Sequence, residues 1–154
     1  MADSIVVLTD NVSTVIASID VASSTIVTSA VQGPAGISGA NATISYIAGV
    51  ALGGHRGVVL SDSTAIYADS TISSHANKLI GITASAVSSG SFANIQSSGE
   101  LDGFSGLIVN AIMYLQTTGI INSNLPTSGF IQQVGIATSA TKILINIQPI
   151  LFIG

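Results

Sequence analysis

The chain has 154 residues, of which 47% are apolar and only 6% are charged, against roughly a quarter charged in ordinary soluble domains. Its net charge is −4 and its only basic residues are Arg56, Lys78 and Lys142, so it lacks the positive charge on which nucleic-acid binding depends. The absence of cysteine excludes disulfides and thiolate chemistry, and no run of about 18 uninterrupted apolar residues suggests a membrane helix.

The residue types predict an all-β fold. Ile, Val and Thr are abundant whereas Glu, Lys and Arg are scarce, and branching at Cβ favours an extended backbone. Apolar runs of about four to eight residues are bounded by Gly, Ser, Asn and Asp, as expected for short strands joined by turns. Asp3 stands where a secretory signal would carry positive charge, so we expect no export signal here and, given the lack of cysteine, synthesis in a reducing cytoplasm.

Residues 1–31 are predicted to form an arm of short strands within 5–8, 14–21 and 24–31. So few residues bury too little surface to be stable alone in water. We therefore expect a partner chain to cover the arm's apolar residues. These are Ile5, Val6, Val7, Leu8, Val15, Ile16, Ile19, Val21, Ile26 and Val27.

Residues 32–41 are interpreted as a linker. Gly33, Gly36 and Gly39 recur at every third position, and Pro34 follows the first of them. This is the spacing of collagen, in which only glycine fits at the axis of three chains. The alternative is a flexible Gly/Ser linker, and either interpretation places a domain boundary here.

Residues 42–154 are predicted to form a small β-barrel or sandwich built from two related meanders. The first copy comprises residues 58–70 and 79–86, and the second comprises 112–121 and 133–140. Each copy leads through a turn into a second strand and then into a third strand that contains Gly81 or Gly135. Glycine inside a strand indicates a bulge, a corner or a close backbone approach.

Two further segments are assigned from the sequence. Residues 92–106 suggest a strand followed by a long glycine-rich loop from Gly99. The final segment, with Ile150, Leu151, Phe152 and Ile153, is too apolar for a free tail, so we expect it to pack against the domain or, preferably, a neighbouring subunit. Arg56 is either an interface residue reaching a neighbour's carboxylate or carbonyl, or a solvated surface arginine.

No motif predicts catalysis, a cofactor or a metal. His55 and His75 are the only candidate bases, but no G-x-S-x-G elbow accompanies them. The glycines around His55 lack the GK[ST] ending of a phosphate-binding loop. The two histidines do not have the spacing of metal ligands, so we expect no enzyme activity.

The region from about Ala42 to Ile147 resembles the carboxy-terminal domain of phage head-fiber and capsid-decoration proteins. The resemblance is carried by IAGVALGGHRGVVLSDSTAIYADS, HANKLIGITASAVSSGSFANIQSSGEL and MYLQTTGIINSNLPTSGFIQQVGIATSATKILI. A valine- and threonine-rich arm and a GPAG-type collagen-like junction upstream are also similar to such proteins. The chain departs from relatives by lacking tryptophan between Leu101 and Val109, which removes stacking surfaces for a sugar.

The resemblance implies a homotrimeric structural protein on the outer surface of a virion. Residues 1–31 would anchor the chain to the major capsid protein, the glycines of residues 32–41 and Pro34 would form the trimer junction, and residues 42–154 would project outward. The alternative is a receptor- or glycan-binding tip of a phage tail fiber. Neither hypothesis identifies a host-surface ligand.

Overall fold

The structure, a computed structural model, describes residues 4–9, 14–19, 24–27 and 41–153. The chain divides into two units, Met1–Ser38 and Gly39–Gly154. The described residues form strands, turns and two short 3₁₀ segments, which confirms the predicted all-β class. None of their helical segments is long and apolar enough to cross a membrane.

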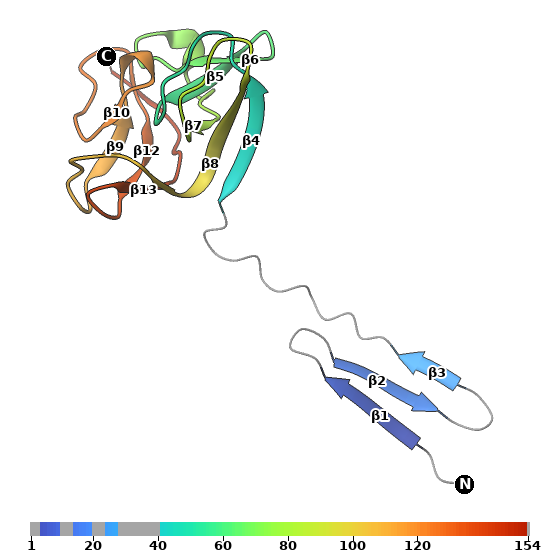
Figure 1. Cartoon of the computed structure of the whole chain (residues 1–154). Helices are drawn as coiled ribbons and strands as arrows, with labels where there is room; N and C mark the ends of the chain where they lie inside the picture. The colour runs from blue at the N-terminus through green and yellow to red at the C-terminus, as the bar shows by residue number, and fades with distance from the viewer. Residues whose placement is uncertain (1–3, 10–13, 20–23, 28–40, 154) are drawn as a thin grey trace. The chain divides into compact units, whose positions relative to one another are not determined.

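The described part of the first unit is an antiparallel meander in the strand order β1-β2-β3 (Figure 1). Its strands are β1 (Ser4–Thr9), β2 (Thr14–Ile19) and β3 (Ser24–Val27). The backbone register places Val7 opposite Ile16, and Ile16 opposite Val27. Three strands therefore form where the β-branched runs predict them.

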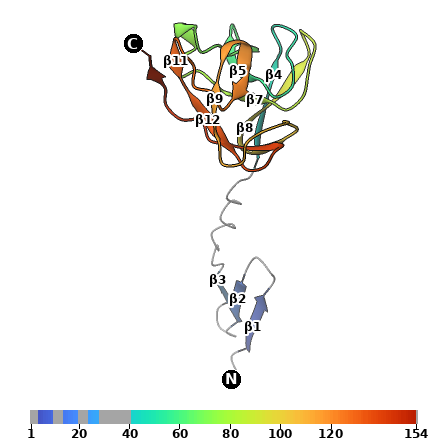
Figure 2. The same cartoon turned by 90° about the vertical axis from the view of Figure 1, so that its left-hand side faces the viewer.

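The second unit is dominated by one curled sheet (Figures 1 and 2). Its described strands are β4 (Ala42–Ile47), β5 (Gly57–Ser61), β6 (Thr64–Tyr67), β7 (Gly81–Thr83), β8 (Phe92–Asp102), β9 (Ile112–Leu115), β10 (Ile121–Asn122), β12 (Gln133–Ala137) and β13 (Lys142–Ile145). A separate strand pair joins β11 (Phe130–Ile131) to β14 (Leu151–Phe152). The 3₁₀ segments are η1 (Ser73–His75) and η2 (Thr117–Gly119).

The sheet consists of two related meanders, as the sequence predicts. In the first repeat, β5 pairs with β6 and β7, and β7 pairs with β8. In the second repeat, β9 pairs with β10 and β12, and β12 pairs with β13. Because β8 also pairs with β13, the order β6-β5-β7-β8 continues as β13-β12-β9-β10.

The first repeat is curled, and β4 closes the curl by joining β8 to β6. β4 pairs with β8, and Ala48, directly after β4, bridges to Ala65 on β6. Inside this curl lies a small cluster of buried apolar residues: Ala48, Leu52, Val58, Ala65, Ala93 and Ile95. The small alanine side chains let the strands approach closely around this core.

A second, larger core lies between the two repeats. Val59, Ile82 and Leu79 from the first repeat share it with residues of the second. The second repeat and the strands beside it contribute Leu101, Met113, Leu115, Ile121, Phe130, Val134, Ala137, Ile143 and Ile145. The face of the first repeat that points away from its own small core therefore packs against the concave face of the second repeat.

One predicted boundary is wrong. The glycine-rich loop was expected to begin at Gly99, but β8 continues to Asp102. Gly99 has a positive φ of 86°, so the strand bends there without ending. The buried side chain of Gln96 donates from Nε2 to the carbonyls of Ser98 and Glu100, at 3.1 and 2.9 Å, and these bonds hold the bend.

Candidate interaction surfaces

The first candidate surface is the three-stranded sheet of the arm. In the described part of the chain, β1 and β3 each pair only with β2, so each has one open edge. The three strands contain no charged residue and no proline, because Asp3, Asp10 and Asp20 all fall outside them. Strand edges of soluble proteins are normally protected by such residues.

The structure places most of the predicted anchoring residues on these strands. Ile5, Val6, Val7 and Leu8 lie on β1, Val15, Ile16 and Ile19 on β2, and Ile26 and Val27 on β3. Val21 and the junction residues Gly33, Pro34, Gly36 and Gly39 lie outside the described residues. Their assigned roles stay predictions.

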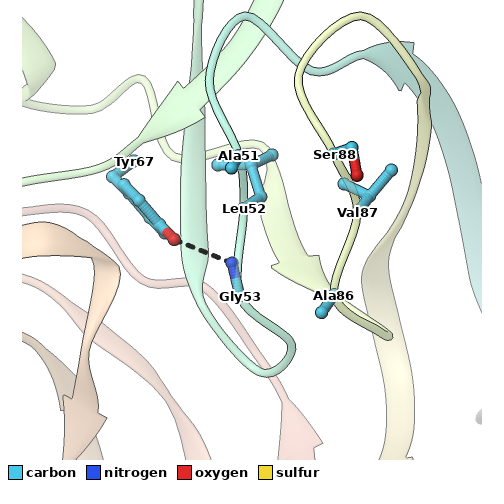
Figure 3. Close-up of a pocket in the computed structure, with 7 residues that line it drawn as sticks. All are labelled: Ala51, Leu52, Gly53, Tyr67, Ala86, Val87 and Ser88. Carbon is cyan, nitrogen blue, oxygen red and sulfur yellow. Dashed lines mark hydrogen bonds between the residues drawn. The ribbon is translucent and has the colours of Figure 1, made fainter.

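A cleft of about 450 Å³ opens beside the smaller core (Figure 3). Its wall carries Ala51, Leu52, Ala86, Val87 and Ser88. The Gly53 N–H donates to the hydroxyl of Tyr67 at 2.7 Å, which fixes the tyrosine at one side of the cleft. The Tyr67 hydroxyl is already bonded to the backbone, and Ser88 has no acid or base beside it among the lining residues, so this cleft offers no pair of a nucleophile and a base.

A second cleft, of about 330 Å³, contains His55 and Arg56. The His55 ring lies 4.7 Å from the Phe104 ring, centroid to centroid, and its Nε2 is 3.0 Å from the Asp102 carbonyl oxygen. A Cβ on Gly103 would lie only 2.5 Å from this nitrogen, so the glycine makes room for the ring. The histidine thereby ties the turn before β5 to the end of β8.

Arg56 has no ion-pair partner among residues 41–153, where Lys142 and Glu100 form an ion pair at 3.5 Å. Its backbone N–H donates to the hydroxyl of Thr83 at 3.0 Å, and its side chain is half-buried beside the second cleft. These contacts fix the backbone position of Arg56. Its predicted role at a subunit interface is not tested by them.

The other histidine belongs to a hydrogen-bonded cluster around Asp69. The Asp69 N–H donates to His75 Nδ1 at 3.1 Å, and its carboxylate accepts from Thr71 and from the Thr118 N–H. Burial raises the pKa of Asp69, but these hydrogen bonds outweigh it, so the pKa is lowered. The cluster holds the segment after β6 against η2.

The described residues show no arrangement of catalytic groups. Neither His55 nor His75 is hydrogen-bonded to a side-chain hydroxyl there, whereas a nucleophilic triad requires that contact. Within the same residues, no three His, Asp or Glu side chains gather as metal ligands would.

The carboxy-terminal tail is tied to its own unit but remains exposed. Leu151 and Phe152 pair with Ile131 and Phe130, yet 66% and 63% of their surfaces are accessible. Ile150 and Ile153 are half-buried. The backbone is thus fixed on the domain, while packing against a neighbouring subunit stays a prediction.

One exposed apolar surface was not anticipated from the sequence. Ile136 on β12 pairs with Ile112 on β9 and with Leu144 on β13, and 37–42% of each of these three residues is exposed. We call Ile112, Ile136 and Leu144 the outer row. The sequence pattern that could have revealed this surface is a run of aliphatic residues on both faces of these strands. A strand with one face in water would instead alternate aliphatic and polar residues.

Comparison with known proteins gives no family assignment. No family model matches the chain, and no curated protein matches it significantly.

Proposed function

We propose that the chain is a non-enzymatic virion structural protein, a homotrimeric head fiber or decoration protein on the outer surface of a tailed-phage capsid. The observation that carries the proposal is the uncharged arm sheet with an open edge on both β1 and β3. The arm would contact the major capsid protein, and the second unit would project from the shell.

The physical basis is β-augmentation. An open strand edge presents backbone donors and acceptors that a strand of another protein satisfies. A three-stranded sheet of 16 strand residues is marginal by itself in water, so pairing with a shell protein would stabilise both edges. The resemblance of the sequence to phage head-fiber proteins supports the same assignment.

A structural role for the second unit is supported by how its polar groups are used. His55 contacts a backbone carbonyl, His75 accepts from a backbone N–H, and the hydroxyl of Thr83 bonds to Gly53 and Arg56. Such bonds fix loops. Groups committed to the backbone in this way favour a structural part over a catalytic one.

The experiment is co-sedimentation of the purified full chain with undecorated capsids of the phage that encodes it. We expect saturable binding, its loss on deletion of Met1–Val31, and its weakening by Val7→Lys, which puts a charge on β1. Thr43→Lys on exposed β4 is the control. Because the second unit has its own two cores, the truncated protein should still fold, and because it keeps the predicted trimer junction in residues 32–41 it should still be a trimer.

Binding of the truncated protein to capsids would overturn anchoring by residues 1–31. A full-length trimer that ignores capsids would favour the alternative, a receptor- or glycan-binding tip of a tail fiber. The two outcomes differ in the same sedimentation run, because oligomeric mass and capsid binding are measured separately.

A further inference from the structure

The second cleft combines a cavity with a charged side chain that the described protein does not use. Its volume of about 330 Å³ is at the lower end of the range for small-molecule sites. Its walls come from the turn before β5, the loop after β8 and the segment that joins η2 to β10. Three segments that are distant in the sequence therefore converge on one hollow.

The stem of Arg56 is held between two of these segments. A Cβ on Gly53 would lie 3.6 Å from Arg56 Cγ and 3.7 Å from its Nε, and one on Gly119 would lie 3.2 Å from Arg56 Cβ. The backbone of Arg56 is fixed as well, since its carbonyl accepts from the Thr83 N–H at 2.9 Å. A side chain held in this way loses little further conformational freedom when its guanidinium binds a ligand.

The guanidinium of Arg56 has no protein acceptor among residues 41–153. The ion pair described there joins Lys142 to Glu100, and the hydrogen bonds of Arg56 in this range involve its backbone N–H and carbonyl. A guanidinium carries five donors in a planar fork that matches a carboxylate or a phosphate. A positioned fork without a protein partner, on the wall of a cleft, is suited to an anionic ligand.

The charge of the cleft favours a monoanion. No acidic side chain lines it, and Arg56 is the one lining residue with a permanent charge. The carboxylate of neighbouring Asp102 accepts from the Gly103 N–H at 2.8 Å and lies outside the lining residues. A single guanidinium matches a carboxylate in charge and in geometry, whereas a phosphate group carries about 1.5 to 2 negative charges at pH 7.

The cleft also carries apolar side chains beside the charged one. Leu107, Ile120 and Ile121 line it together with Phe104, whose ring is in contact with the His55 ring at a centroid distance of 4.7 Å. Small-molecule sites typically combine such apolar walls with one or two polar groups that orient the ligand. The wall therefore favours a ligand whose carboxylate is attached to an apolar body.

We infer that the second cleft binds a small organic monocarboxylate, with Arg56 holding the carboxylate through its planar fork and the apolar side chains contacting the rest of the ligand. The inference goes beyond the proposed function, because the site lies within the second unit and needs neither the arm nor a capsid. The carboxylate that Arg56 reaches then belongs to a small molecule and not to a neighbouring subunit.

The test is a titration of the full chain with benzoate, a carboxylate on an apolar ring, and with its neutral counterpart benzamide. We expect benzamide to bind at least about tenfold more weakly, because a hydrogen bond to a charged group contributes about that factor. Arg56→Gln should weaken benzoate binding by a similar factor, and Arg56→Lys, which keeps the charge but loses the fork, by less. The control is Lys78→Gln, which removes an exposed cation outside the cleft.

Amide chemical shifts followed during the titration locate the bound benzoate. We expect changes at Gly54 and Leu107 in the second cleft, and none at Ala51 and Val87 in the first cleft, which has no charged lining residue (Figure 3). Ser105→Leu introduces a larger side chain at an exposed lining position. It should abolish these changes with Arg56 intact, while urea unfolding checks that each variant is folded.

Three results would overturn the inference. Absent binding, or equal affinities for benzoate and benzamide, would remove the selection of a carboxylate. Chemical-shift changes confined to residues outside the second cleft would place the ligand elsewhere. Benzoate binding that appears only when an oligomer is diluted to monomers would assign Arg56 to the carboxylate of a neighbouring subunit.

Discussion

Gly81 and Gly135 occupy the same position in the two repeats, each facing the neighbouring strand so closely that a side chain does not fit. A Cβ on Gly81 would collide with the carbonyl oxygen of Gln96 on β8, and one on Gly135 with that of Leu144 on β13. In both repeats an isoleucine side chain, of Ile95 or Ile143, closes the remaining space. The close approach is a shared requirement of the duplicated unit.

We therefore expect Gly81→Ala and Gly135→Ala each to lower the free energy of unfolding by about 1–3 kcal/mol, the usual cost of forcing extra atoms into a packed site. The measurement is urea unfolding of each variant. Gly53→Ala is the control, because a Cβ there would meet its nearest neighbour at an ordinary 3.6 Å. Equal stability of all three variants would contradict the close approach.

The buried Thr83 allows a test of how the loop before β5 is held. Its side chain is fully buried, and its hydroxyl donates to the Gly53 carbonyl at 2.7 Å and accepts from the Arg56 N–H at 3.0 Å. Thr83→Val keeps the shape but leaves both backbone groups unpaired, which costs about 1–3 kcal/mol.

The effect of Thr83→Val should appear in two measurements. Urea unfolding reports the loss of stability, and amide hydrogen exchange at Arg56 should accelerate because its N–H loses its partner. The matched control is Thr43→Val at an exposed position of β4. Unchanged exchange at Arg56 would show that the hydroxyl does not hold the loop.

The His75 cluster predicts a pH dependence of stability. Burial lowers the pKa of His75, Asp69 raises it and Lys78 lowers it, and the net result is a pKa below the usual 6.5. The unfolded chain then binds a proton more readily than the folded one, so this contribution is present above pH 6.5 and is lost as pH falls through the folded pKa. Protonation also removes the acceptor that Nδ1 offers to the Asp69 N–H.

The measurement is the free energy of unfolding between about pH 7.5 and pH 5. We expect it to fall below about pH 6.5 in the wild-type chain, and this decrease to be smaller in His75→Gln, whose amide oxygen accepts the same bond without titrating. An identical pH profile for the two proteins would rule out His75 as the cause. The lowered pKa of Asp69 changes the free energy of unfolding only at lower pH, because its contribution is present above its usual 3.8 and is lost as pH falls below that value.

Local signals in the sequence predicted most of the fold. The β-branched runs predicted the arm strands, and Gly81 and Gly135 marked the third strand of each repeat. The hairpin turn at Asp62 and Ser63 was also predictable. Both residues adopt positive φ, 47° and 66°, in a turn that favours Asp or Asn.

The remaining features depend on distant contacts. The continuation of β8 past Gly99 is set by pairing of residues 99–102 with 142–145, which no local pattern reveals. The outer row was missed because Ile112, Ile136 and Leu144 become neighbours only through strand pairing. The partner of the arm cannot be predicted from its sequence, because an open strand edge indicates binding by strand addition but does not identify the protein that binds.

The two phenylalanines of the β11–β14 pair allow the predicted role of the tail to be tested. Phe130 is fully buried and Phe152 is 63% exposed, although their rings meet edge to face at 6.5 Å. Phe130→Ala should cost about 3–5 kcal/mol in urea unfolding. Phe152→Ala should cost under about 1 kcal/mol in dilute protein, since it loses mainly an aromatic pair.

If the tail packs against a neighbouring subunit, Phe152→Ala will also lower the oligomeric mass in sedimentation, because the exposed ring would be buried only there. An unchanged oligomer would place the tail on its own domain alone.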